Sequence, residues 1–332
     1  MAGDAPLLRI EGLVTHFEVR SGPLRRVTDV VRAVDGVDLE VSRGKTLALV
    51  GESGCGKTTV GRTLLGLEQA RSGRIWFDGV DLSTLDSEAR RSMRQRIQMV
   101  FQDPAAALDP RLRISDAVAE GMQAFGIGRN SRERRERVAD LLEQVKLDRA
   151  LMERYPHELS GGQRQRVCIA RALAVDPELV VCDESVSALD VSIQAQILNL
   201  LAELQEQRGL SYLFITHDLQ VVRHVADRVA VMYLGQIVEE GSVERIFRAP
   251  AHPYTQGLLA AAPSLDLEVR GRPVLLGGDV PSPLRPPRGC RFHTRCPVAL
   301  ARCADEMPDS REFEDGVGRC FLLGDRSFDR RV

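Results

Sequence analysis

Residues 51–58 read GESGCGKT, and this stretch decides how the rest of the chain is interpreted. It fits the pattern G-x-x-x-x-G-K-[ST], follows the apolar run 47–50 and precedes a helical pattern. A glycine-rich loop between a buried strand and a helix presents backbone N–H groups to phosphate oxygens. Lys57 is expected to reach the β- and γ-phosphates, and the Thr58 hydroxyl to bind Mg²⁺. Cys55, at the helix N-terminus, is predicted to be a reactive thiolate that nucleotide protects.

The composition narrows the classes of protein to consider. The chain has 332 residues, 43% of them hydrophobic and 28% charged, which is typical of a globular protein with a substantial core. A net charge of −2 argues against a strongly basic nucleic-acid surface. No run approaches 18 consecutive apolar residues and no secretory signal is evident, so we expect a cytosolic protein.

Two acidic residues supply the carboxylates that a phosphate site needs. Asp183 and Glu184 end the apolar run 179–182. Asp183 would bind Mg²⁺ through its water shell, and Glu184 would polarise an attacking water. On their own, two acids after a strand could simply be solvated, but a phosphate loop in the same chain favours the functional interpretation.

A second anion cradle is predicted at residues 160–163, which read SGGQ and precede a helical pattern. One nucleotide needs one cradle, so two cradles suggest a nucleotide held between two subunits. Apolar runs at 179–182, 213–215 and 229–232 alternate with helical patterns, which indicates parallel βαβ units. Segment 103–157 is predicted to be helical, and the arginine-rich segment 20–32 to be an exposed loop.

The order and spacing of these features resemble the ATP-binding subunit of ABC transporters. The resemblance rests on the loop at 51–58, Gln102, residues 159–163, residues 183–184, residues 187–190 and His217, and covers roughly residues 7–250. It implies an α/β fold: a P-loop ABC-type nucleotide-binding domain with a RecA-like core, an antiparallel β subdomain and a helical subdomain at about 103–160. We expect this ATPase domain to span 1–260, followed by a small Pro- and Cys-rich domain over 261–332.

The resemblance also assigns roles to residues. It implies catalytic roles for Lys57, Glu184 and His217, and Mg²⁺ ligands in Thr58, Gln102 and Asp183. Ser160, Gly162 and Asp190 would act across a dimer, and Phe17 would stack on adenine. The residues expected to bind ATP are Phe17, Gly51, Glu52, Ser53, Gly54, Cys55, Gly56, Lys57, Thr58, Thr59, Gln102, Ser160, Gly161, Gly162, Gln163 and Asp190.

The C-terminal segments narrow the resemblance. The stretches AHPYT at 251–255, VPSP at 280–283 and GCRFHTRCP at 289–297 resemble the ATPases of bacterial oligopeptide, dipeptide and nickel importers. That resemblance implies a subunit at the cytoplasmic face of the membrane. Its partners would be a second ATPase subunit, two transmembrane permeases and an extracytoplasmic binding protein, without nucleic acid. A heterodimer of ATPases is favoured over a homodimer.

Four cysteines follow this segment, at Cys290, Cys296, Cys303 and Cys320. Four thiolates can bind a [4Fe–4S] cluster or a tetrahedral Zn²⁺, and the spacing lacks the Cys-x2-Cys pairs of common zinc modules. The resemblance to importer subunits favours the cluster over Zn²⁺; disulfides or free thiols remain open. His293 could substitute for one ligand, although four cysteines already suffice. Because no ATP-motif residue lies after 260, ATP binding is expected to depend little on this segment.

The sequence thus predicts an ATPase that energises peptide uptake. Nickel or glutathione uptake, a soluble ABC ATPase without a transport role, and a module that binds ATP without turnover remain as alternatives. Glu184 and His217 argue against the last of these.

Overall fold

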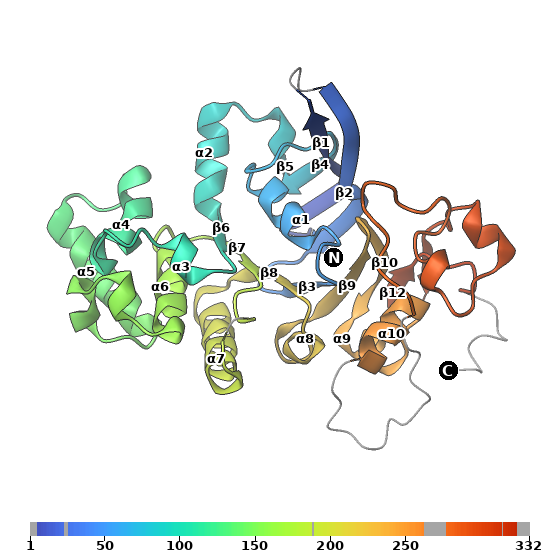
Figure 1. Ribbon diagram of the computed structural model, residues 1–332. Helices are drawn as coiled ribbons and strands as arrows, with labels where there is room; N and C mark the ends of the chain where they lie inside the picture. Colours follow the sequence, from blue (N-terminus) through green and yellow to red (C-terminus); the bar gives the residue numbers. More distant parts are fainter. Residues whose placement is uncertain (1–4, 23–25, 188, 262–276, 314, 324–332) are drawn as a thin grey trace. The chain divides into compact units, whose positions relative to one another are not determined.

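The computed structural model describes residues 5–22, 26–187, 189–261, 277–313 and 315–323 (Figure 1). They form two compact units. Unit 1 comprises Met1–Val41, Leu47–Ser83 and Thr216–Val332, and unit 2 comprises Ser42–Thr46 and Thr84–Ile215. The predicted boundary near residue 260 is followed at once by residues 262–276, which lie outside the described residues.

Unit 1 contains an antiparallel sheet with the strand order β2-β1-β4-β5. These strands are β1 (Leu8–Ser21), β2 (Arg26–Val41), β4 (Ser72–Phe77) and β5 (Val80–Asp81). The prediction of an exposed loop at 20–32 is wrong, because β1 and β2 pair as far as Ser21 and Arg26. Valines 27, 30 and 31 explain the difference, since β-branched side chains favour strands even when the arginines on either side of them are exposed.

In a second sheet of unit 1, the phosphate loop follows the C-terminal end of a strand. β9 (Arg228–Tyr233) pairs in parallel with β3 (Thr46–Val50) and antiparallel with β10 (Gln236–Ser242). All five residues of β3 are buried, as expected for a continuous apolar run in a parallel strand. We call the described residues after 276 the Cys-rich extension. It continues this sheet through β12 (Gly316–Gly318) and β11 (Arg311–Phe313).

The helices of unit 1 are short. They are α1 (Lys57–Leu64), α8 (Leu219–Val225), α9 (Val243–Arg248) and α10 (Pro253–Ala261), with 3₁₀ turns η1 (Leu82–Thr84), η4 (His293–Arg295) and η5 (Ala301–Ala304). One core cluster joins β3, β9, Tyr254 of α10 and Phe292 of the extension. The extension therefore shares its hydrophobic core with the strands that carry the phosphate loop.

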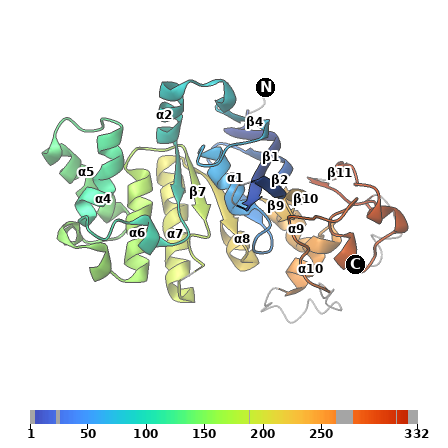
Figure 2. The same ribbon diagram turned by 45° about the horizontal axis from the view of Figure 1, so that its top comes forward.

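In unit 2, β7 (Leu179–Asp183) lies between β6 (Ile97–Val100) and β8 (Ser211–Thr216), and all three strands are parallel. Helices α4, α5 and α6 pack side by side (Figure 2). The helices of this unit are α2 (Ser87–Arg96), α3 (Pro104–Ala107), α4 (Ile114–Ala124), α5 (Ser131–Gln144), α6 (Gly161–Leu173) and α7 (Val191–Arg208), with 3₁₀ turns η2 (Arg149–Glu153) and η3 (Pro156–Glu158). Parallel strands, an antiparallel β-sheet and a helical segment together confirm the predicted fold class. Among the described residues, we find no helix with the length and apolarity to cross a bilayer.

Candidate nucleotide site and cysteine pocket

The loop between β3 and α1 lies directly against backbone. A Cβ atom at Gly51 would lie 2.2 Å from the carbonyl oxygen of Met232, and one at Gly56 would lie 2.0 Å from that of Ala33. Gly56 also has a φ of 110°, which L-residues rarely adopt. Glycine is therefore required at both ends of the loop, as the sequence pattern predicts.

Lys57 begins α1 and is buried within the loop. Its Nζ donates hydrogen bonds to the carbonyl oxygens of Gly51 (2.8 Å) and Glu52 (3.1 Å). Gly56 is the N-cap of α1, and as a glycine it contributes no side-chain hydrogen bond to the helix N-terminus. A buried cation next to a helix N-terminus suits a phosphate group.

The environment of Cys55 differs from the reactive, accessible thiolate that the sequence predicts. Its side chain is buried, and burial raises the pKa of its thiol; the Lys57 ammonium opposes this only in part. The carbonyl oxygen of Cys55 accepts a hydrogen bond from the Gly235 N–H at 2.8 Å. Cys55 is thus a packing residue of the loop rather than an accessible thiolate.

Glu52 has two contacts that the sequence motifs do not reveal. Its N–H donates to the hydroxyl of Tyr254 at 3.0 Å, and its carboxylate accepts two hydrogen bonds from Arg295. Tyr254 belongs to the AHPYT stretch and Arg295 to the segment between two cysteines. Both were identified from the sequence only as markers of a subfamily, so neither was predicted to contact the loop.

The carboxylate pair lies in unit 2, where β7 ends. Asp183 is buried, and Glu184 follows with a φ of 45°, which is strained for a residue other than glycine. The Glu184 N–H donates to the Ile215 carbonyl oxygen at 2.9 Å, and its carboxylate accepts a hydrogen bond from Gln102 Nε2 at 2.8 Å. The structure therefore brings together Gln102 and Glu184, which the sequence predicted to share a site.

The second cradle begins α6. Ser160 is the N-cap: its Oγ accepts the Gln163 N–H at 3.3 Å, and Gln163 Oε1 accepts the Ser160 N–H at 2.9 Å. This reciprocal capping box holds both side chains at the start of the helix. A Cβ atom at Gly162 would lie 2.7 Å from Ile193 Cγ2, so α6 needs a glycine there to pack against α7.

The other predicted ATP residues fall in both units. Phe17 lies on β1 with 37% of its surface exposed, which suits a ring that stacks on a ligand. His217 is exposed in the turn between β8 and α8, and Asp190 is exposed at the N-cap of α7. Ser53 and Gly54 are exposed at the loop tip, and Thr58 and Thr59 lie in the first turn of α1.

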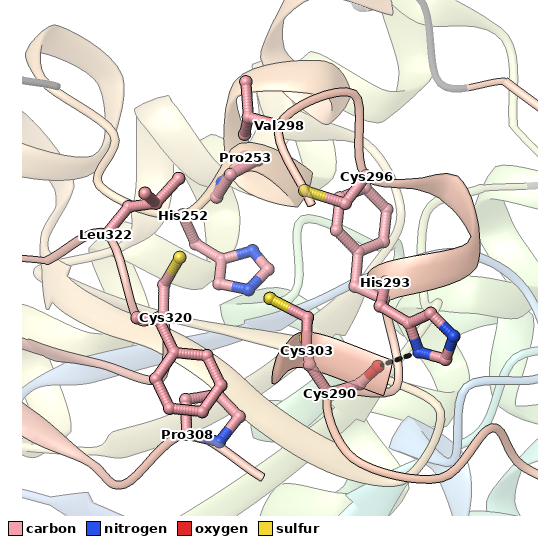
Figure 3. A pocket seen from close by; sticks show the side chains of 12 residues that line it. His252, Pro253, Cys290, His293, Cys296, Val298, Cys303, Pro308, Cys320 and Leu322 are labelled. Atoms are coloured by element: carbon pink, nitrogen blue, oxygen red, sulfur yellow. Dashed lines mark hydrogen bonds between the residues drawn. The ribbon is translucent and has the colours of Figure 1, made fainter. Parts of the chain in front are cut away.

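The four C-terminal cysteines line one pocket (Figure 3). His252, Phe292 and His293 also line it. All seven cysteines are within the described residues and all are free, so no disulfide closes this pocket. In the part of the chain that the structure describes, no three His, Cys, Asp or Glu residues are arranged to hold a metal ion.

The thiols of this pocket are partly buried, and three of them receive backbone donors. Burial raises the pKa of both Cys290 and Cys296 to about 11, and the other thiols of the pocket add to the increase. In three cases the N–H two residues further along donates toward the sulfur. These pairs are Phe292 to Cys290, Val298 to Cys296, and Leu322 to Cys320. Such N–H groups favour the thiolate form, which is the form that binds metals.

His252 is neutral within this pocket. Burial lowers the pKa of its imidazole to about 3. Its Nδ1 accepts the Tyr254 N–H at 3.0 Å, so the proton of the neutral ring is on Nε2. Glu239 beneath it accepts the N–H groups of Ala251 and His252, which fixes the start of α10.

Comparison with protein families gives two matches along this chain. Residues 34–187 match the ABC transporter model, and residues 238–303 match the model of the oligopeptide/dipeptide transporter C-terminal region. The oligopeptide transport ATP-binding protein AppF of Bacillus subtilis is 48% identical over 94% of this chain and 95% of its own length. The dipeptide transport ATP-binding protein DppF of Haemophilus influenzae is 46% identical over 96% of this chain and 98% of its own.

Solved structures show the same architecture. CbiO1 of Clostridium perfringens, part of the ABC transporter complex cbiONQ, is 29% identical with a TM-score of 0.63, covering 74% of this chain and 91% of that one. The ATP-binding cassette MJ0796, in a dimeric structure bound to ADP and phosphate, is 28% identical with a TM-score of 0.63, covering 71% and 98%. The fold and site thus define an ABC-type ATPase. The chain belongs to the ABC transporter family, in the branch whose members carry the oligopeptide/dipeptide transporter C-terminal region.

Replacing Glu184 with Gln is expected to preserve ATP binding but to slow hydrolysis at least tenfold, because an amide cannot polarise the attacking water. Tenfold corresponds to about 1.4 kcal/mol of barrier. Steady-state phosphate release by the assembled complex is the measurement. Glu206→Gln, an exposed glutamate on α7, is the matched control and should hydrolyse ATP normally. Normal hydrolysis by the Glu184 variant would rule out this role.

Cys55 is expected to resist a thiol alkylator in the folded protein with or without Mg-ATP, and to react fully after denaturation. The reason is its burial and raised pKa. Peptide mass spectrometry measures the labelling, and Leu67→Cys at an exposed position provides a reactive control. Rapid labelling of Cys55 that Mg-ATP prevents would instead support the sequence-based expectation.

Proposed function

We propose that this chain is the subunit that binds and hydrolyses ATP to drive peptide import across the cytoplasmic membrane. The observation that carries the proposal is the presence, in one chain, of the ABC transporter match and the oligopeptide/dipeptide transporter C-terminal match. Relatives of nearly the same length, AppF and DppF, are named for oligopeptide and dipeptide transport. Hydrolysis of ATP with Mg²⁺ is the common chemistry of this family.

The proposed catalytic roles agree with the geometry within each unit. Lys57 would hold the terminal phosphates from within the loop, and Thr58 of unit 1 and Asp183 of unit 2 would each supply an oxygen ligand to Mg²⁺. Glu184 polarises the attacking water, and the hydrogen bond from Gln102 orients its carboxylate. Gln102 would also supply a ligand to Mg²⁺, and His217 would hold the γ-phosphate. Most of the acceleration comes from positioning and charge stabilisation rather than from covalent chemistry.

The second cradle acts on a partner's nucleotide. Ser160, fixed as the N-cap of α6, and Gly162 face the γ-phosphate bound by the opposite ATPase subunit, and Asp190 joins the two sites. Exposure of Ser160 and Asp190 in the single chain supports this role. ATP binding closes the two subunits head to tail, and hydrolysis opens them.

The partners follow from this cycle. An ABC ATPase of an importer pairs with a second ATPase and with permeases. We propose a related but different ATPase subunit as the dimer partner, two transmembrane permeases and an extracytoplasmic binding protein. The chain then lies at the cytoplasmic face of the membrane. We also propose the division into an ATPase domain over 1–260, with a helical subdomain at about 103–160, and a Pro- and Cys-rich domain over 261–332.

Reconstitution tests this function. The complex that co-purifies with the full-length chain is placed in proteoliposomes with its binding protein, and ATP-driven uptake of labelled dipeptides, oligopeptides, nickel and glutathione is measured. We expect peptide uptake that requires ATP hydrolysis. Uptake of nickel or glutathione without uptake of peptide would show that peptide is not the cargo. ATP hydrolysis without any co-purifying membrane subunit would point to a soluble ABC ATPase.

We further propose that Cys290, Cys296, Cys303 and Cys320 bind a [4Fe–4S] cluster. Support comes from the single pocket that the four free thiols share and from the backbone N–H groups directed at three of the sulfurs. Each cysteine of a cubane cluster binds a different iron, so its ligands are spaced more widely than those of one ion. Zn²⁺, which a single tetrahedral set of ligands would bind, is the alternative that elemental analysis distinguishes. The cluster would stabilise a segment with little core of its own.

Protein purified without oxygen is expected to be brown and to contain roughly four irons per chain. Cys320→Ser should lose the iron and destabilise the extension, because one of four ligands is gone. Cys168→Ser, a buried cysteine of α6 outside the pocket, is the control and should keep the iron. Elemental analysis decides: one zinc without iron would establish a zinc site, and no metal would remove both proposals.

A further inference from the structure

The Cys-rich extension reaches the phosphate loop through one ion pair. Arg295, the last residue of η4, donates to both carboxylate oxygens of Glu52, from Nη1 at 2.7 Å and from Nη2 at 3.0 Å. Parallel hydrogen bonds of this kind fix the orientation as well as the distance of the two groups. Only 5% of the Arg295 side chain is exposed, whereas 27% of the Glu52 side chain is, so solvent and salt reach the pair only from the side of the carboxylate.

Besides the ion pair with Glu52, two further contacts hold the guanidinium of Arg295. Its Nε donates to the Gly277 carbonyl oxygen at 3.2 Å, and its Cζ lies 5.8 Å from the centre of the Tyr233 ring. Tyr233 in turn packs against Tyr254 and Phe292, with ring centres 4.6 Å and 5.3 Å apart. The aromatic cluster therefore sets where the positive charge is presented.

Glu52 is equally constrained from the side of the loop. Its N–H donates to the Tyr254 hydroxyl at 3.0 Å, and its carbonyl oxygen accepts from Lys57 Nζ at 3.1 Å. Arg295 and Tyr254, both C-terminal to the nucleotide motifs, thus hold the residue that also contacts the lysine of the phosphate loop.

The charge of Glu52 makes this contact relevant to the ligand. Glu52 is the one acidic residue between Gly51 and Thr59, and the nucleotide brings several negative charges to the same loop. An unpaired carboxylate there would repel the phosphates, whereas an ion-paired carboxylate does so much less. Asp183 and Glu184 are acidic too, but their proposed roles are to bind Mg²⁺ and to polarise the attacking water, so their negative charges are needed for the reaction.

We propose that Arg295 is a positioning residue of the nucleotide site: it neutralises Glu52 and fixes the first turn of the phosphate loop for ATP. The extension is then part of the ATP-binding site, although no nucleotide motif lies in it. This reverses the expectation that ATP binding depends little on residues after 260. The inference does not require the proposed metal cluster or the identity of the cargo.

The test measures the Kd of a fluorescent ATP analogue with Mg²⁺ for the full-length chain. Arg295→Gln is expected to raise the Kd at least tenfold, because Glu52 is left charged and unpaired. Glu52→Gln in the same chain should restore most of that affinity, since it removes the repulsive charge. The loss should also shrink as salt is raised, because screening weakens the repulsion. A purely structural role for Arg295 would not produce this rescue or this salt dependence.

Arg291→Gln is the matched control. Arg291 lies in the same segment and is also buried, but it pairs with Asp35 of β2 and with the Leu234 carbonyl oxygen. Arg291→Gln should change the Kd by much less than Arg295→Gln. Arg295→Lys, which keeps the charge without the paired hydrogen bonds, should fall between wild type and Arg295→Gln. An unchanged Kd in Arg295→Gln, equal losses in both arginine variants, or no rescue by Glu52→Gln would overturn the proposal.

Discussion

The close approach of the phosphate loop to neighbouring backbone is the constraint on which unit 1 depends. Gly51 and Gly56 lie so near the carbonyl oxygens of Met232 and Ala33 that no side chain fits. This contact fixes the loop to β9 and β2, and it leaves Lys57 buried beneath the loop with its charge directed at loop carbonyls. Because a rigid loop loses little entropy when phosphate binds, the packing of these glycines is itself part of the ligand affinity.

The extension completes this arrangement from the C-terminal side. It adds β11 and β12 to the sheet that contains β9, and it contributes Phe292 to the core and Arg295 to the loop. Buried ion pairs of this kind often add little net stability, because desolvation offsets the attraction. What they do here is connect elements: Arg295 with Glu52, and Arg291 with Asp35, join the segment that also carries the cysteine pocket to the phosphate loop and to β2.

Much of this could be predicted from the sequence, because the informative features are local. The loop, the strand before it and the acids after β7 all depend on short patterns in which residue type and spacing determine the chemistry. The extension of β1 and β2 into residues 20–32 is not predicted, because the exposed arginines 26 and 32 obscure the strand preference of the valines between them. Cys55 was misjudged because its burial depends on packing against distant strands, and the contacts of Glu52 join residues more than 200 positions apart. Sequence periodicity carries no information about such contacts.

Hydrogen exchange of the full-length Glu184→Gln chain, with and without Mg-ATP, tests the central claim most directly. This claim is that the phosphate loop and the Cys-rich extension respond to nucleotide as one body. The account predicts that Mg-ATP slows exchange of backbone amides both in the loop at 51–58 and in the segment 289–296. Protection confined to the loop, with unchanged exchange across 289–296, would contradict it.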